Sequence, residues 1–121
     1  MLKVVINICH GGFGLSKEAV FKYAELKDMQ IWHEKATLCD HYYKEDPATL
    51  FSNADKNRAY FCIDSIRRDD HALVMVVEQL GQASWGDYAE LKVVEIPEDV
   101  QWEIEEYDGR EWISEVHRCW S

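Results

Sequence analysis

The chain is 121 residues long, the length of one domain, and we expect a single domain over residues 1–121. Hydrophobic residues make up 47% of it, with five tryptophans and six tyrosines, a composition that excludes a disordered chain. Thirteen lysines and arginines against 23 aspartates and glutamates give a net charge of −10, which disfavours direct binding to DNA or RNA because phosphates repel an acidic surface.

The N-terminal region predicts a strand, a tight corner and a helix. Residues 3–8 (KVVINI) form a short, mostly β-branched run that is typical of a buried strand. Three glycines follow within residues 11–14. Ser16 then stands as the N-cap of residues 17–27, whose apolar positions are spaced as in a helix.

The middle of the chain has weaker patterns. Residues 30–43 predict one or two irregular strands, and residues 59–64 (AYFCID) predict another short strand. Between them, residues 44–56 hold a proline and several turn formers. We therefore expect a long exposed loop there.

A second helix is expected over residues 71–85, where the apolar side chains lie near one helical face. Asp69 or Asp70 is placed to cap its first turn, and Gly86 suits its end. Residues 91–97 then predict a strand that a proline stops.

The last third predicts a β-hairpin. Asp108-Gly109 is a strong signal for a type I′ turn, and alternating apolar residues stand on both sides of it, in residues 100–104 and 112–116. A helix over residues 98–107 also fits the spacing, but the Asp-Gly pair favours the hairpin. The order of elements predicts an α+β fold: a mostly antiparallel sheet with two helices packed on one face and a C-terminal β-hairpin.

The apolar runs are all shorter than the ~18–20 residues of a membrane span, and the first residues lack the pattern of a signal peptide. We therefore expect a cytoplasmic protein without membrane contact, whose four cysteines are reduced. Partial exposure of the aromatic residues leaves a homo-oligomer open.

Two motifs resemble those of a known family. GGFGLS at residues 11–16 and the acidic EYDG hairpin at residues 106–109 are similar to motifs in a family of small uncharacterised proteins encoded by bacteriophages and prophages. The resemblance implies a bacteriophage protein in the cytoplasm of the host cell. It also implies action by binding a host component, such as an anti-phage defence protein, or by sequestering a nucleotide signal.

Negative charge is concentrated in residues 95–111, which hold eight acids and one base for a net charge of −7, whereas the rest of the chain carries −3. Such a run is either a solvated face or a binding surface for a basic partner. Our first interpretation is a non-enzymatic protein that binds and inhibits a basic host protein through this acidic strip. The strip consists of Glu95, Glu98, Asp99, Glu103, Glu105, Glu106, Asp108 and Glu111.

The glycine-rich corner suggests an alternative function. A strand, a glycine turn and a helix N-terminus can bind an anion, because free backbone N–H groups and the helix dipole favour negative charge. The glycine order matches neither the dinucleotide fingerprint nor the P-loop, so a purely structural corner fits as well. The alternative is a protein that binds a nucleotide or nucleotide signal. Its small ligand would contact Gly11, Gly12, Phe13, Gly14, Ser16, Arg110 and Trp112.

Catalytic and metal chemistry have weaker support. Cys9 would lie near a helix N-terminus, which favours a thiolate, but His10 is poorly placed as its base because adjacent strand residues face opposite ways. The segments 39–41 (CDH) and 117–119 (HRC) have unusual spacings for structural zinc sites. We predict no catalytic residues, no metal and no cofactor, and we favour a protein without enzymatic activity.

Overall fold

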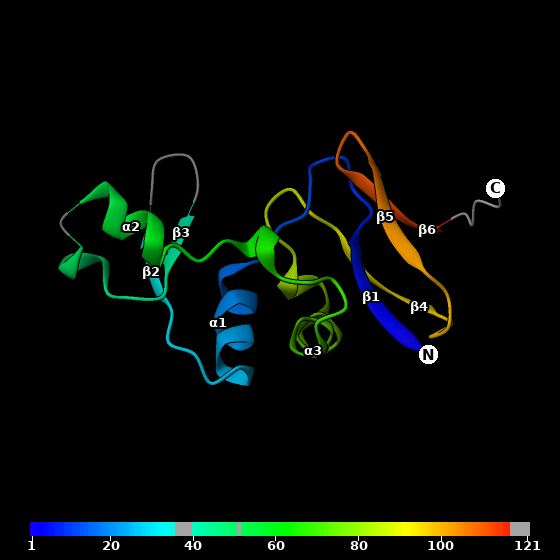
Figure 1. Cartoon of the computed structure of the whole chain (residues 1–121), viewed down its shortest axis with the longest axis horizontal. Coiled ribbons are helices and arrows are strands. Elements are labelled where there is room, and N and C mark those ends of the chain that lie inside the picture. Colours follow the sequence, from blue (N-terminus) through cyan, green and yellow to red (C-terminus); the bar gives the residue numbers. More distant parts are fainter. Residues whose placement is uncertain (36–39, 51, 117–121) are drawn as a thin grey trace, which may run out of the picture.

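The structure is a computed structural model that describes residues 1–35, 40–50 and 52–116 (Figure 1). The helices are α1 (Lys17–Leu26), α2 (Asn53–Ala59) and α3 (His71–Leu80). The strands are β1 (Leu2–Asn7), β2 (Trp32–Lys35), β3 (Asp40–Tyr43), β4 (Leu91–Ile96), β5 (Trp102–Tyr107) and β6 (Arg110–Glu115). None of the helices in these ranges has the length and apolarity needed to cross a membrane.

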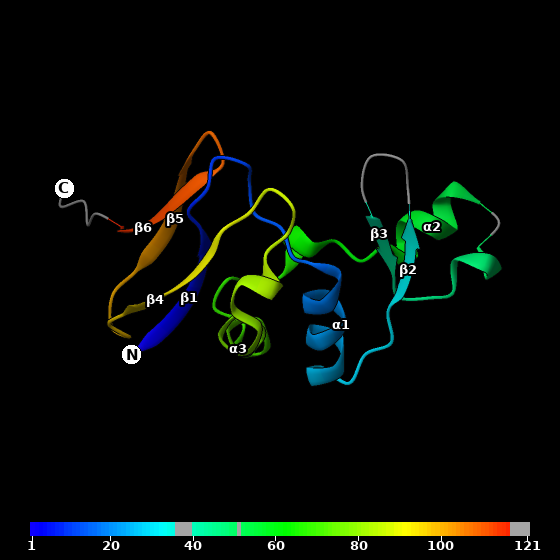
Figure 2. The ribbon, with the colours of Figure 1, turned by 180° about the vertical axis from the view of Figure 1, so that it is seen from behind.

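Each strand pairs antiparallel with one neighbour: β1 with β4, β2 with β3, and β5 with β6. Figures 1 and 2 show α1 and α3 in the middle of the molecule, with the β2–β3 pair on one side and the β1–β4 pair and the β5–β6 hairpin on the other. The α+β class, the antiparallel pairing and the C-terminal hairpin are confirmed. Among the described residues, the strands form three separate pairs.

The hairpin turn is of the expected type. Asp108 and Gly109 have φ values of +52° and +88°, which are the two positive φ angles of a type I′ turn. Its strands, β5 and β6, pair from Trp102 opposite Glu115 to Tyr107 opposite Arg110. The helical interpretation of residues 98–107 is therefore excluded.

The core lies between the two long helices and one face of the β1–β4 pair. Val5 of β1, Val20 of α1 and Leu73 of α3 are completely buried and belong to one apolar cluster. Tyr42 of β3 and Phe61 join the same cluster. The β2–β3 pair is thereby attached to the helices by aromatic packing.

Both predicted helix caps are observed. The Ser16 side chain accepts a hydrogen bond from the Ala19 N–H at the start of α1. Asp70 caps α3 by accepting from the Ala72 N–H at 2.9 Å. Asp69 instead pairs with Arg67 on the surface.

The second helix is shorter than the sequence suggests. It ends at Leu80, and Gly81 has the positive φ angle, +55°, that terminates it. A short 3₁₀ turn, Gly81–Ser84, follows. Gly86, the predicted end, packs instead against Gly14, where a Cβ atom would lie only 2.8 Å from the Gly14 carbonyl carbon.

Two expectations for the middle of the chain are wrong. Residues 44–56 are not a continuous loop, because Ser52 caps α2 by accepting from the Asp55 N–H. Residues 59–64 are not a strand: only Tyr60 makes a bridge, with Tyr43, and a 3₁₀ turn begins at Ile63. Residues such as serine, asparagine and aspartate serve as helix caps as readily as loop formers.

Asp70 also connects α3 to α1. It accepts a hydrogen bond from the Tyr23 hydroxyl at 2.9 Å and pairs with the Lys27 ammonium at 3.0 Å. Burial raises the pKa of Asp70, but hydrogen bonds from Lys27, Tyr23 and the Ala72 N–H together outweigh burial, so its pKa lies below the ordinary value. Burial, followed by the bond to Asp70, raises the pKa of Tyr23 to about 12.

This arrangement predicts a pH dependence of stability. Because the pKa of Asp70 is depressed in the folded protein, its contribution is present above about pH 4 and is lost as the pH falls through the folded-state pKa. Asp70→Asn keeps a capping oxygen but removes the charge. We expect the unfolding free energy of the wild type, measured with urea, to fall more steeply between about pH 5 and pH 3 than that of Asp70→Asn. Asp69→Asn should follow the wild type, and equal slopes for the wild type and Asp70→Asn would contradict the prediction.

Candidate functional site

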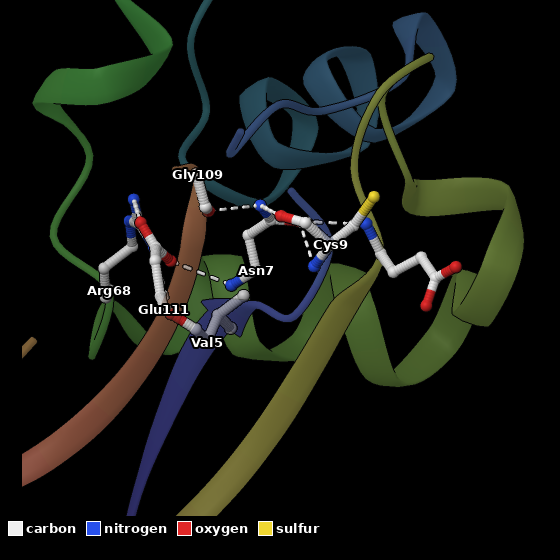
Figure 3. A network of polar contacts seen from close by, with 7 residues as sticks. Val5, Asn7, Cys9, Arg68, Gly109 and Glu111 are labelled. Carbon is white, nitrogen blue, oxygen red and sulfur yellow. Dashed lines mark hydrogen bonds and ion pairs between the residues drawn. The ribbon is translucent and has the colours of Figure 1, made fainter. Parts of the chain in front are cut away.

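A buried asparagine holds the corner between the first strand and the hairpin turn. The Asn7 side chain is inaccessible to solvent. Its Nδ2 group donates to the Cys9 carbonyl at 2.7 Å and to the Gly109 carbonyl at 2.8 Å, as Figure 3 shows. Its Oδ1 atom accepts from the Glu90 N–H at 2.9 Å and from the Cys9 N–H at 3.4 Å. All of its hydrogen-bonding capacity is used, so its burial carries no unpaired polar group.

A buried ion pair continues this network. Glu111 is 8% exposed, and its carboxylate accepts two hydrogen bonds from the Arg68 guanidinium, at 2.5 and 2.9 Å. The same carboxylate accepts the Asn7 backbone N–H at 2.8 Å (Figure 3). The Arg68 guanidinium carbon lies 3.6 Å from the centre of the Phe13 ring, a cation–π contact. The ion pair is therefore largely shielded from water, with the Asn7 N–H bonded to its carboxylate and the Phe13 ring packed on its guanidinium.

This pair also satisfies the free edge of β1. The Val5 N–H donates to the Arg68 carbonyl at 2.8 Å, and the Arg68 guanidinium donates to the Val5 carbonyl at 3.4 Å. Together with the Asn7 N–H on Glu111, these bonds take the place of a third strand. The arginine and the glutamate thus explain why β6 lies beside β1 without forming a backbone ladder with it.

The glycines of the corner are used for close packing. A Cβ atom on Gly109 would overlap the His10 carbonyl oxygen and lie 2.8 Å from the Gly12 nitrogen. A Cβ on Gly11 would overlap the Tyr88 carbonyl oxygen. Phe13, within the same glycine-rich segment, packs its ring on the Arg68 guanidinium. The arrangement favours the structural interpretation of the glycine-rich segment.

Ser16 at the glycine corner is not free to bind an anion. The Ser16 N–H donates to the Ser84 carbonyl at 3.0 Å, and the Ser16 hydroxyl donates to the Ala83 carbonyl. A cavity of about 260 Å³ lies over the corner, and its lining includes one cation, Lys17, and one carboxylate, Asp87, so it carries no net positive charge to attract a phosphate.

The residues of the predicted nucleotide site do not share one cavity. Gly11, Gly12, Phe13, Gly14 and Ser16 line the cavity at the corner. Arg110 and Trp112 line a different one, a groove of about 510 Å³. The structure thus brings the corner residues together and places Arg110 and Trp112 at a separate cavity, while the hairpin turn packs against the corner at Gly109.

The groove lies where the β1–β4 pair meets the hairpin. Three of its large apolar side chains are exposed: Tyr107 by 73%, Trp112 by 43% and Ile8 by 38%. The residues that line the groove are Ile6, Ile8, His10, Lys92, Tyr107, Arg110, Glu111 and Trp112.

The acidic strip is divided by the alternation of the hairpin strands. Glu111 does not belong to an exposed strip, because it is buried against Arg68; this corrects the prediction. Its cross-strand neighbour Glu106 is exposed on the same face. Glu103, Glu105, Tyr107, Arg110 and Trp112 share the opposite face, which we call the Trp112 face.

The remaining acids are exposed. The Glu98 carboxylate lies 3.2 Å from the N-terminal amine, and Glu105 accepts a hydrogen bond from the Trp112 indole N–H at 2.9 Å. Glu106 accepts from the Gly109 N–H at 2.9 Å and supports the turn. The exposed members of the strip are Glu95, Glu98, Asp99, Glu103, Glu105, Glu106 and Asp108.

No group of three or more histidine, cysteine, aspartate or glutamate side chains is arranged to hold a metal ion within the described ranges. Segment 117–119 and Cys39 lie outside those ranges. Cys9 is half-buried, and its backbone is held by Asn7. His10 is exposed at the groove.

Asn7 and Arg68 are central to the network, although the sequence-based predictions give no role to Asn7 and only a local one to Arg68. Asn7 ends the apolar run of β1, and a polar residue there is a signal for a buried hydrogen-bonding role. In the sequence, Arg67 and Arg68 precede two aspartates and a helix, an order that predicts a local cap with ion pairs more readily than a phosphate clamp. That interpretation holds for Arg67, whereas Arg68 reaches a residue far away in the sequence.

Comparison with protein-family models, with curated proteins and with solved structures finds no significant match for this chain. The resemblance to bacteriophage proteins therefore stays a prediction.

Glu111→Gln tests the ion pair. The amide keeps the shape and an acceptor for Asn7 but leaves Arg68 without its counter-charge. We expect the unfolding free energy to fall by on the order of 3 kcal/mol, because an unpaired buried charge is costly. Glu106→Gln, on the exposed side chain across the hairpin, should cost about 1 kcal/mol or less. Adding Arg68→Met to Glu111→Gln should recover part of the loss, and a further loss would exclude the unpaired charge as its cause.

Gly109→Ala tests the packing of the turn on the corner. Gly109 and Gly12 both have positive φ angles, +88° and +97°, so alanine introduces similar backbone strain at each. Only at Gly109 does the added carbon meet other atoms. We expect Gly109→Ala to cost about 1–3 kcal/mol more than Gly12→Ala in urea unfolding. Equal losses would show that the turn does not need this close contact.

Proposed function

We propose that this protein is a non-enzymatic interaction protein that binds a basic protein surface through the Trp112 face of its hairpin. The observation that carries the proposal is the exposure of Trp112 and Tyr107 beside two glutamates, Glu103 and Glu105, on the same face. Exposed aromatic side chains of this kind are typical anchors of protein interfaces.

The hairpin is presented as a rigid element. Asn7 bonds to the hairpin at two points: its backbone N–H donates to the Glu111 carboxylate, and its side chain donates to the Gly109 carbonyl in the turn. The Arg68 guanidinium also donates to Glu111. The indole N–H of Trp112 is bonded to Glu105, which restricts the orientation of the ring. A surface that is already ordered loses less conformational entropy on binding, so more of the contact energy contributes to affinity.

Charge selects the kind of partner. Glu103 and Glu105 lie on the same face as the aromatic anchors, and the chain as a whole carries −10. Such a field accelerates encounter with a basic surface and repels acidic ones. Arg110 is a single positive charge on this face and can meet one acidic group at the rim of the partner.

The resemblance of the two motifs to bacteriophage proteins supplies the biological setting of the proposal. In that setting the partner is a basic protein of the host cytoplasm, such as a component of anti-phage defence, and binding inhibits it. The geometry supports a protein-binding surface; the host identity rests on the resemblance alone.

The test reverses charge on the Trp112 face. Basic proteins of a bacterial host lysate are captured on the immobilised full chain, and the affinity of each is then measured with the purified protein. We expect Glu103→Lys with Glu105→Lys to weaken binding about tenfold or more, because attraction becomes repulsion. Binding should also weaken as salt rises from about 0.05 M to 0.5 M.

Glu25→Lys with Asp64→Lys is the matched control, since these exposed acids lie away from the hairpin and give the same change in net charge. This control should bind like the wild type. Hydrogen exchange of β5 and β6 should slow in the complex. A partner that both variants bind equally, or protection elsewhere only, would exclude the Trp112 face as the interface.

A further inference from the structure

We infer that the groove between the β1–β4 pair and the hairpin binds a small molecule that combines a flat aromatic ring with an anionic group. This site goes beyond the proposed protein interface but overlaps it, because Tyr107, Arg110 and Trp112 belong to both. The groove has two cations, apolar walls and the volume of a small-molecule site.

Two cations at the groove have no acidic partner. Lys92 of β4 and Arg110 of β6 are exposed, and neither makes an ion pair with any described residue. Their positive charges are therefore not neutralised by an acid of the described residues, although the chain has a net charge of −10. Lys92 belongs to the β1–β4 pair and Arg110 to the hairpin, and both line the groove, so both attract an anion bound there.

The acid at the groove does not neutralise these cations. Glu111 lines the groove, but its carboxylate is bonded to the Arg68 guanidinium and to the Asn7 N–H. Its negative charge is therefore balanced by Arg68. Lys92 and Arg110 remain to attract a bound anion, and His10 adds a polar ring at the same cavity.

The rest of the lining suits an aromatic ring. Ile6 and Ile8 of the first strand region contribute aliphatic surface, while Trp112 and Tyr107 contribute aromatic surface. Aromatic faces stack on flat rings, so Trp112 and Tyr107 suit the ring of a ligand. A volume of about 510 Å³ is in the range of small-molecule sites.

A small molecule fits better than a nucleic acid strand. The neighbouring hairpin carries Glu103, Glu105 and Glu106, which would repel a continuous phosphate backbone. A single anionic group can contact Lys92 and Arg110 without approaching all of these acids. A nucleoside monophosphate and an aromatic carboxylate share the required chemistry.

The experiment compares charged and neutral probes by nuclear magnetic resonance titration of the ¹⁵N-labelled full chain. Adenosine 5′-monophosphate and 1-naphthoate are the anionic probes, and adenosine and 1-naphthamide are their neutral counterparts. We expect at least one anionic probe to shift the signals of Lys92 and the Trp112 indole, and to bind about tenfold more tightly than its neutral counterpart. The stronger of the two anionic probes distinguishes a nucleotide from an aromatic carboxylate.

Lys92→Gln with Arg110→Gln tests the assignment of the two cations. Both side chains are exposed, so the variant should fold, and the remaining signals of its spectrum check this. We expect it to bind the anionic probe about tenfold more weakly while binding of the neutral one is unchanged. Lys22→Gln with Lys44→Gln removes the same charge elsewhere and should bind like the wild type. Failure of both anionic probes to shift groove signals, equal binding of neutral probes, or unchanged binding by the Lys92 and Arg110 variant would overturn the inference.

Discussion

The buried carboxylate of Glu111 is the group on which the arrangement of the β1 end of the molecule depends. A charge removed from water must be paired and hydrogen-bonded, and Arg68 and the Asn7 N–H meet this requirement. The three residues come from β6, the segment before α3, and β1. Satisfying one carboxylate therefore determines where the hairpin lies relative to the first strand, and Phe13 completes the enclosure of the guanidinium.

This arrangement explains why the corner after β1 is rich in glycine. Glycines at positions 11 and 109 allow backbone to approach backbone where a side chain would overlap a carbonyl group. Asn7 then bonds to the carbonyls of Cys9 and Gly109, which are brought within reach by that approach. The corner that resembles a phosphate loop in sequence is a joint between the N-terminal strand and the C-terminal hairpin.

The same joint divides the charges of the hairpin between two environments. On one face Glu111 is buried and paired; on the other, Glu103 and Glu105 stand exposed beside Trp112. That face is acidic and aromatic apart from Arg110, which also lines the neighbouring groove together with Lys92. The two proposals, binding of a basic protein and binding of a small anion, follow from these two environments.

Local signals in the sequence determined the parts of the fold that depend on neighbouring residues. Ser16 and the Asp69-Asp70 pair marked the helix starts, and Asp108-Gly109 marked the hairpin, because caps and turns are built within a few residues. The α+β class followed from these elements. Only the tertiary structure decided that Glu111 is buried and that Arg110 lies apart from the glycine corner. Those facts depend on contacts between residues about 40 to 100 positions apart in the chain, such as Arg68 with Glu111 and Asn7 with Gly109, and no short-range pattern records which distant groups will satisfy each other.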